Sequence, residues 1–494
     1  MSRYFRLYAV MFGTAVVAAS LGGCAVNRAT NIEVGEALER YRDRAPADAA
    51  AFSATDRHAA LSPSTEVTHA ESQSTEGAPA SLRDSILIAL RDNPSIKAAE
   101  ETALAKAARV SQVTAPPNPM LMTKTLPEPV RTAEGDNYFI LGIQQQLVLP
   151  QKLERAGQIA FQEARMALES LQHSRLNVIA DVKRTYFRLY VIDRTVEADR
   201  TNQDLLRGLI DVARARVAAG QRRQDDVLRA QVELSSLESQ LIELRQERET
   251  LVALFNRLLN RPPQTPVPVL PEYNPDTVDL RLENLLEPAF AQNPELRRLK
   301  EQLERDRLAV ELAKLAYWPD VTLGFEWMYI KPRDAFVPPP DPQTGRVGAV
   351  NRLSEDGSDN WAVTVALNLP LWLGKIEGAI REARHELLAS QHEYAAAKNR
   401  VSYEIEDALA RVRAQQELAE LFRGTIIPQA QQAYEVSRAS YAGGDSDFLY
   451  VIDNWRKWLT YTIHYHRALG ELERSVADLE QTLGLSLSEA GGGS

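Results

Sequence analysis

Cysteine is nearly absent from this sequence, in which Cys24 is the only one among 494 residues. A single cysteine excludes an intrachain disulfide and a cysteine-based metal cluster. Histidine is scarce too, and the only close pair, His464 and His466, stands two positions apart, which directs the side chains to different faces of a helix. No phosphate loop, nucleophile elbow or metalloprotease motif occurs. We therefore predict no catalytic residue, no metal site and no cofactor, and we do not expect an enzyme.

Positive charge and long apolar runs are also limited. Lys and Arg number 57 against 67 Asp and Glu, and the net charge of −10 argues against nucleic acid as a partner. After Cys24 no run of about 18 apolar residues occurs, so a further transmembrane helix is not expected. Any crossing of a bilayer would then need β-strands.

The N-terminus predicts export and a lipid anchor. A short basic region precedes an apolar stretch, residues 7–19, that is too short to span a bilayer as a helix. The stretch ends in Leu21-Gly22-Gly23-Cys24, which resembles a bacterial lipobox, so residues 1–23 are expected to be a signal peptide and Cys24 the lipidated residue. Ala25 stands where an aspartate retains many lipoproteins at the inner membrane, which favours the outer membrane. An ordinary secretory signal with an accidental cysteine is the alternative.

Beyond the N-terminus, one segment of the chain recurs 200 residues later. The recurring residues are Leu82, Ala89, Asn93, Pro94, Glu101, Val110 and Pro119, which return as Leu282, Ala289, Asn293, Pro294, Glu301, Val310 and Pro319. Such self-similarity predicts a structural unit written twice. The expected segments are a tether rich in Ala, Ser, Thr and acidic residues (24–80), a first copy (81–262), a linker (263–280), a second copy (281–485) and a disordered tail (486–494).

Alternation of apolar and polar residues predicts two strands in each copy. The predicted strands are residues 118–126 and 138–149 in the first copy and residues 320–330 and 360–371 in the second. Loops are expected between them, at 127–136 and 331–359. Strands of about ten residues with an aromatic-rich face, here Phe325, Trp327 and Trp361, are typical of membrane β-barrels. A soluble antiparallel sheet with one buried face is the alternative.

Very long helices are expected to follow the strands. The predicted long helices are residues 152–219 and 375–442, and the predicted return helices are residues 225–260 and 447–483. The first long helix contains no proline, whereas Gly424 and Pro428 are expected to bend the second one locally. About 65 helical residues would measure about 100 Å. Heptad spacing of leucines in the first return helix predicts coiled-coil packing against the long helix before it.

The number of strands predicts an assembly of several chains. About four strands per chain are too few for a barrel, which needs at least about eight. Open strand edges cannot be left in lipid. Several chains are therefore expected to share one barrel, with the helices continuing its wall as a tube.

The doubled unit resembles the TolC-type outer-membrane efflux family over residues 81–485. The motifs that carry the resemblance are Asn93-Pro94, Asn293-Pro294, Leu149-Pro150-Gln151-Lys152 and Leu371-Trp372-Leu373-Gly374-Lys375. The family implies a mainly α fold with a membrane β-barrel portion, in which a homotrimer forms a 12-stranded barrel continued by an α-helical coiled-coil tunnel. It also implies a periplasmic adaptor and an inner-membrane pump, of the RND type, as partners. Pro117-Asn118-Pro119, Gln146 and Lys152 look most like the heavy-metal efflux branch.

The resemblance places the closed periplasmic entrance of the tunnel at the helix tips. Gly220 and Gly444 mark the two tight reversals, because each lies seven residues before a valine of the return helix. By position, Asp226 with Tyr441 looks like a lock pair, and Asp453 looks like a carboxylate that faces the lumen.

The tip sequence also departs from the family pattern. Tyr450 stands where a second gate aspartate is common, and Ser446 replaces a basic link residue; Asp445 and Asp447 are further candidates for the missing charge. The alternative is that these acids cap the N-termini of the return helices.

The sequence thus predicts a passive exit duct in the outer membrane, lipid-anchored, with its helical part in the periplasm and a gate at the helix tips. It would serve a tripartite efflux system or a type I secretion system. A lipid-anchored periplasmic coiled-coil scaffold without a pore is the alternative, and it predicts that Phe325, Trp327 and Trp361 are buried in protein. The sequence does not specify the exported substrate.

Overall fold

The structure is a computed structural model that describes residues 35–36, 39–40, 81–132, 134–220, 223–273, 281–332, 339–347 and 357–487. The predicted signal peptide, Cys24 and most of the predicted tether and tail lie outside these residues. The described chain forms two compact units. The first includes Leu104–Arg165 and Glu301–Gln391, and the second includes residues 81–103, Met166–Lys300 and residues 392–487.

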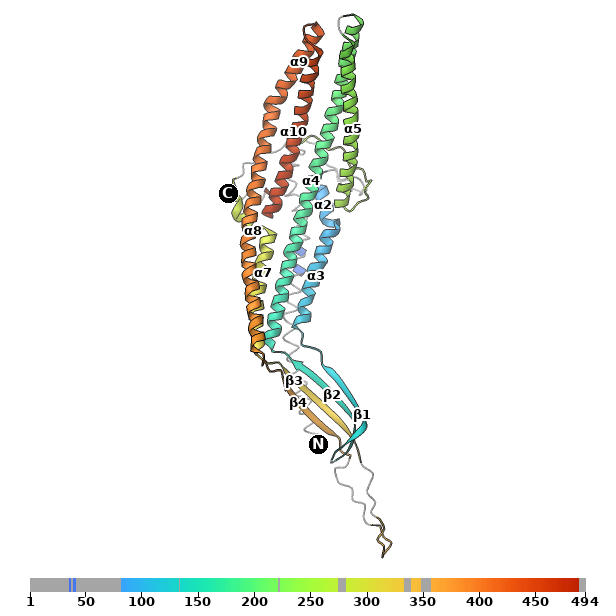
Figure 1. Cartoon of the computed structure of the whole chain (residues 1–494), viewed down its shortest axis with the longest axis vertical. Coiled ribbons are helices and arrows are strands. Elements are labelled where there is room, and N and C mark those ends of the chain that lie inside the picture. Colours follow the sequence, from blue (N-terminus) through green and yellow to red (C-terminus); the bar gives the residue numbers. More distant parts are fainter. Residues whose placement is uncertain are drawn as a thin grey trace, which may run out of the picture. The chain divides into compact units, whose positions relative to one another are not determined.

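The two halves of the chain have the same order of elements: two helices, two strands, a long helical stretch and a return helix (Figure 1). The first half contains α2 (Leu82–Asp92), α3 (Pro94–Thr114), β1 (Met120–Thr132), β2 (Gly135–Leu147), α4 (Pro150–Ala218) and α5 (Gln224–Leu258). The second half contains α6 (Leu282–Gln292), α7 (Pro294–Lys314), the 3₁₀ turn η2 (Leu315–Tyr317), β3 (Val321–Lys331), β4 (Asn360–Leu367), α8 (Leu373–Leu421), the π-helical turn η3 (Phe422–Ile426), α9 (Ile427–Gly443) and α10 (Phe448–Leu483).

The predicted long helices are confirmed. The helix predicted at residues 152–219 is α4, an unbroken helix of 69 residues. Its counterpart is interrupted at η3, two residues before Pro428. Proline has no N–H to donate to the preceding turn, so a π-helical turn at this point has a direct cause. Among the helices that the structure describes, none is both long and apolar enough to cross a membrane.

The first unit contains a four-stranded antiparallel sheet in the order β1-β2-β3-β4. All four predicted strands are confirmed, but the predicted loop at 127–136 is wrong. β1 continues to Thr132 and β2 begins at Gly135. The register of β1 against β2 shifts between Thr125 and Val130, which is where Pro127 and Pro129 lack the N–H groups of a regular ladder. The irregularity carries the strand past both prolines.

Lys152 joins the strands and helices of the first unit where they meet. Its ammonium group lies 2.9 Å from the Asp320 carboxylate and donates to the Trp318 carbonyl over 2.8 Å. Both side chains of the ion pair are less than one fifth exposed. The pair therefore joins the start of α4 to the start of β3, and partial burial strengthens it relative to a surface pair.

Each Asn-Pro ties a return helix to the start of a short helix in the second unit. The Asn93 side chain accepts a hydrogen bond from the Ser95 N–H and donates to the Leu258 carbonyl at the end of α5. Asn293 accepts from the N–H groups that begin α7 and donates to the Thr482 carbonyl at the end of α10. One amide thus satisfies donors at a helix N-terminus and an acceptor at a helix C-terminus, as helix ends require.

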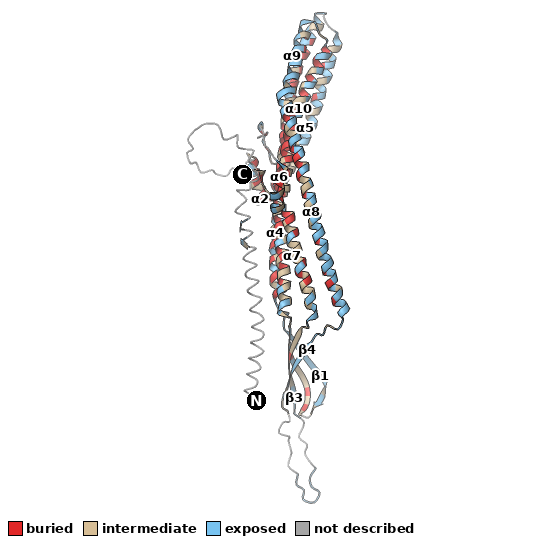
Figure 2. Cartoon of the chain, turned by 90° about the vertical axis from the view of Figure 1, so that its left-hand side faces the viewer, coloured by how far each residue is buried: buried red, intermediate tan, exposed pale blue. Residues whose placement is uncertain are grey.

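Buried residues lie in stripes along the helices instead of a central mass (Figure 2). In the second unit, one apolar cluster joins α6 and α7 with the middle of α8 and the end of α10, around Leu296, Val401 and Leu479. A second cluster, which we call the tip cluster, joins the last turns of α4 and α9 with the first turns of α5 and α10. These clusters follow from amphipathic helices that bury one face each.

Candidate functional site

The two helix reversals that the sequence singled out are both at the tips of the second unit. Gly220 follows α4 with a φ of +68°, and Gly444 follows α9 with a φ of +101°. This left-handed region is open to glycine without the steric penalty of a side chain. The Gly444 N–H donates to the Ser440 carbonyl over 3.0 Å, which satisfies an orphan acceptor at the end of α9. Replacement of either glycine would therefore strain the turn.

The predicted lock pair is in contact. The Tyr441 hydroxyl donates to the Asp226 carboxylate over 3.3 Å, so that the end of α9 is joined to the first turn of α5. The Tyr441 ring is completely buried and packs edge-to-face on Phe448, with 5.2 Å between the ring centroids. The Arg216 guanidinium lies 5.4 Å from the same ring and donates to the Ala442 carbonyl. Tyr441 therefore lies at the centre of the contacts that hold the four helix ends together.

The Tyr441 ring is itself part of the apolar tip cluster. The buried members of this cluster are Leu206, Leu209, Ile210, Ala213, Ala230, Leu237, Tyr434, Tyr441, Phe448, Val451, Ile452, Trp455, Leu459 and Ile463. Burial of a large apolar side chain contributes about 1.5–3 kcal/mol. The apolar cluster, with several such side chains, outweighs the single hydroxyl–carboxylate bond in holding the helices together. The apolar cluster therefore supplies most of the free energy of helix packing, and the polar bond helps to select one arrangement of the packed helices.

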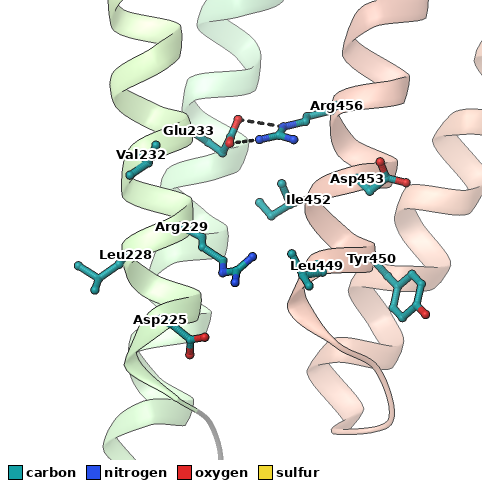
Figure 3. Close-up of a pocket in the computed structure, with 10 residues that line it drawn as sticks. All are labelled: Asp225, Leu228, Arg229, Val232, Glu233, Leu449, Tyr450, Ile452, Asp453 and Arg456. Carbon is teal, nitrogen blue, oxygen red and sulfur yellow. Dashed lines mark hydrogen bonds and ion pairs between the residues drawn. The ribbon is translucent and has the colours of Figure 1, made fainter.

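A groove of about 570 Å³ lies between α5 and α10 next to the tip (Figure 3). Its apolar lining consists of Leu228, Val232, Leu449 and Ile452. At one end the Arg456 guanidinium pairs with the Glu233 carboxylate across the two helices, with 3.0 Å between Arg456 Nε and Glu233 Oε2. The Glu233 hydrogen bond raises the pKa of Arg456.

The other predicted acids take different positions. Asp453 lines the groove and pairs with Lys457 one turn later on α10, over 2.7 Å, with both side chains more than half exposed. Asp447 is the N-cap of α10, because its carboxylate accepts the Leu449 N–H over 3.3 Å. Asp445 is exposed in the turn between α9 and α10. Of the five predicted gate residues, the structure thus joins only Asp226 and Tyr441 to one another.

Sequence reasoning missed two contacts at the tips, those of Arg216 and of Glu233 with Arg456. Arg216 and Arg456 each stand among other charged residues in the sequence, as on a solvated helix face, so the sequence pattern alone does not indicate their partners. Glu233 lies seven residues after Asp226, on the same face of α5. That spacing is the one signal that could have found it.

No chemistry of a metal or cofactor is indicated by the described side chains. Within the residues that the structure describes, no three His, Cys, Asp or Glu side chains lie close enough together to hold a metal ion. The tip instead combines a hydroxyl–carboxylate bond, ion pairs and an apolar cluster, which can hold or release helices.

Comparison with known proteins assigns the chain to a family. The model of the outer membrane efflux protein family matches residues 86–261 and 285–485, most of the chain. Among characterised relatives, the cobalt-zinc-cadmium resistance protein CzcC of Cupriavidus metallidurans is 23% identical over 414 residues, which cover 82% of this chain and 90% of CzcC.

Solved structures show the same fold. The outer-membrane channel OprN has a TM-score of 0.67 at 19% identity, covering 82% of this chain and 89% of OprN. The CmeC outer membrane channel of Campylobacter jejuni has a TM-score of 0.65 at 17% identity, covering 86% of this chain and 94% of CmeC. Nothing in these comparisons supports a scaffold without a pore. The chain belongs to the outer membrane efflux protein family, and its function is efflux across the outer membrane.

Proposed function

We propose that three copies of this chain form one channel, with a shared barrel of 12 strands and an α-helical tunnel built from two tandem repeats per chain. The observation that carries this proposal is the open sheet of the first unit, in which β1 and β4 are edge strands. An open edge presents unpaired N–H and C=O groups, which lipid cannot satisfy. Pairing of β4 from one copy with β1 of the next would close the sheet, and three sheets of four strands give 12.

The exposed side chains of the edge strands support the same assembly. Trp361, Val363, Val365 and Leu367 on β4 are each more than half exposed, as are Met120 and Leu121 on β1. A row of exposed apolar side chains such as the one on β4 marks an interface with protein or membrane. Phe325 on β3 stacks with Trp361, with 6.5 Å between the ring centroids. This aromatic-rich face suits lipid contact in a barrel wall.

The proposed gate is the group of contacts at the helix tips, with Tyr441 and Asp226 as its lock. In the closed packing the Tyr441–Asp226 bond joins α9 to α5, and an adaptor and pump that bind the tips would favour a packing in which this bond is broken. A ligand can shift such an equilibrium only by binding the open packing more tightly. The channel itself is passive, and the pump supplies the energy.

Asp453 is proposed to face the lumen as a carboxylate of this gate. The ion pair with Lys457 does not exclude this role, because an exposed ion pair contributes about 1 kcal/mol or less to stability and is readily broken. Asp453→Ala is expected to weaken the selectivity of the pore for cations, measured as the reversal potential across a planar bilayer in a salt gradient. An unchanged reversal potential would exclude Asp453 from the narrow part of the pore. Asp445 remains a further candidate, whereas Asp447 has its cap role.

The proposed partners are a periplasmic adaptor and an RND-type inner-membrane pump, and the proposed cargo is divalent metal ions. The relative CzcC is named for cobalt, zinc and cadmium resistance, and the Lys152 junction resembles the heavy-metal branch. Loss of the gene is expected to lower growth in cobalt, zinc or cadmium salts, with restoration by the intact gene. Unchanged metal tolerance together with raised drug sensitivity would redirect the proposal to drug efflux.

Lipid attachment at Cys24 is proposed to anchor the chain in the outer membrane. Metabolic labelling with palmitate is expected to mark the intact protein and not the Cys24→Ser variant. Labelling that persists in the variant would refute the lipobox. Because the barrel also crosses the membrane in this proposal, the unlabelled variant should still fractionate with the outer membrane.

The first test is the mass of the detergent-extracted protein, with the detergent contribution subtracted. Three chains of 55.1 kDa give about 165 kDa (3 × 55.1) before leader removal. That mass would support the shared barrel. A monomer that leaves the membrane when its lipid is removed would overturn the channel.

A further inference from the structure

A buried acidic residue lies on α4 next to the tip cluster. Asp199 is completely buried, and neither oxygen of its carboxylate has a hydrogen-bond partner among the described residues. Asn202, one turn later on the same helix, is 7% exposed, and its side-chain oxygen also has no partner there. Buried polar atoms are nearly always paired, so three unpaired oxygens in one place call for an explanation.

The orientation of Asn202 presents its side-chain oxygen to the site as a third acceptor. The amide nitrogen of Asn202 donates to the Ala198 carbonyl over 2.7 Å, which fixes the amide and assigns its oxygen to the opposite side. Residues three apart on a helix are neighbours on one face, so this oxygen and the Asp199 carboxylate lie within reach of a shared partner. None of these three acceptors receives a hydrogen bond from the described residues, and the unpaired Trp455 Nε1–H of the tip cluster does not reach them, so another species has to supply a donor.

Among the residues that the structure describes, no charged group offsets the Asp199 carboxylate. α4 is packed between α5 and α10 in the tip cluster, and Ala198 contacts that cluster. The ionisable side chains on the neighbouring turns of α4, α5 and α10 are either exposed or bonded to other groups. Four are exposed: Arg200, Glu238, Glu243 and Arg245. The others have partners of their own, which are Arg248 with Asp193, Arg194 with Glu197, Arg456 with Glu233, Lys457 with Asp453, and His466 with Tyr190. An ionised carboxylate would therefore be buried alone, at an effective penalty of several kcal/mol.

A proton on the Asp199 carboxylate would meet both needs of the site, a neutral charge and a hydrogen-bond donor. It removes the buried charge, and the resulting hydroxyl can donate to the Asn202 oxygen. A water molecule would supply donors but leave the charge. Burial raises the pKa of Asp199 to about 6, which places its ionisation close to neutral pH.

We propose that Asp199 is a proton-binding site, and that loss of its proton loosens the packing of α4 against α5 and α10 beside the tip cluster. Ionisation favours any packing that admits water to the carboxylate. Leu206, two turns further along α4, is a buried member of the tip cluster, so loosening at Asp199 weakens the same contacts that surround Tyr441. Its influence on the gate rests on the proposed channel function, but the proton site itself does not.

The test is amide hydrogen exchange of the full-length, detergent-extracted protein at pH 5 and pH 8, corrected for the intrinsic effect of pH on exchange. If the carboxyl has a pKa of about 6 when packed and its ordinary value when hydrated, the opening equilibrium of α4 around residue 199 rises about 10-fold over this range. His466 contacts Tyr190, nine residues before Asp199 on α4, so an opening confined to residue 199 leaves it packed with a pKa of about 4, below the range. Where the opening also hydrates His466, its effect has the opposite sign to the expected rise.

Asp199→Asn should abolish the rise, and Asp199→Ser serves if that variant fails to fold. Asp204→Asn is the matched control, because Asp204 is exposed on the same helix and pairs with Arg207; it should retain the 10-fold rise. A flat profile in the unmodified protein, or a rise that persists without Asp199, would overturn the proposal. Saturable protection at pH 8 by sodium, potassium or calcium would also overturn it, in favour of a bound cation. Because exchange reports on helix packing, these outcomes do not depend on whether the protein forms a pore.

Discussion

Replacement of Tyr441 by phenylalanine tests the gate with the smallest possible change. The substitution removes one hydroxyl and keeps the ring, with its contacts to Phe448 and Arg216. A hydrogen bond to a charged group contributes about 1.5–3 kcal/mol. The Tyr441–Asp226 bond is long, at 3.3 Å, and Asp226 is partly exposed, so we expect about 1 kcal/mol. The ratio of open to closed channel should therefore rise about 5-fold.

Conductance of the purified protein in planar lipid bilayers measures this ratio directly. Tyr450→Phe is the matched control, because Tyr450 is exposed near the same tip and directed away from α5 (Figure 3); it should leave the open fraction unchanged. A double variant with Asp226→Asn should open no more than either single variant, because the two residues act through one bond. An open fraction of Tyr441→Phe that equals that of the unmodified channel would refute the lock.

Further predictions concern stability, measured by unfolding of the extracted protein. A side chain at Gly470 would overlap a valine methyl of α4, so Gly470→Ala should destabilise by about 1–3 kcal/mol, whereas Gly378→Ala, with open space around it, should not. Lys152→Met should lower the free energy of unfolding by about 2 kcal/mol, because it leaves the largely buried Asp320 carboxylate without its ion pair; Lys152→Arg should retain most of the stability. Burial lowers the pKa of His466 to about 4. Its contribution to the free energy of unfolding is therefore fully present above pH 6.5 and is lost as pH falls toward 4, with a total loss of about 3 kcal/mol at most. His466→Gln should remove this acid-side loss, and an unchanged slope would contradict the assignment.

Local patterns were sufficient to predict the elements of this fold. No proline occurs between Pro150 and Pro262, which allows a long helix, and α4 ends at Ala218, next to the reversal at Gly220. Alternation identified all four strands, because a strand with one apolar face needs a period of two. The wrong loop near Pro127 shows where local signals mislead: prolines suggest a turn, but a register shift carried the strand past them.

The candidate site could be predicted only in part, because its contacts join helices far apart in the chain. Asp226 and Tyr441 were paired through the family resemblance, since nothing in either segment indicates the other. Asp199 was missed altogether. Its neighbours along the chain, from Glu197 to Asp204, read as a charged and solvated helix face. Only the packing of α5 and α10 against α4 determines that this one acid is buried, and no local pattern contains that information.

The contacts along α10 suggest why motion would be confined to the tips. At the base of the helix, Glu480 pairs with Lys183 over 2.6 Å, and both side chains are less than one tenth exposed. Breaking a buried pair of this kind costs about 3–5 kcal/mol. At the other end, the Asp453–Lys457 pair lies within α10 and does not join it to another helix. There α10 is held by the apolar tip cluster and by the Arg456–Glu233 pair, whose arginine is more than half exposed. Apolar contacts are non-directional, so the tip can repack without leaving a buried charge unpaired, whereas displacement of the base would break the buried Lys183–Glu480 pair. We therefore expect the tip of α10 to change its packing more readily than its base.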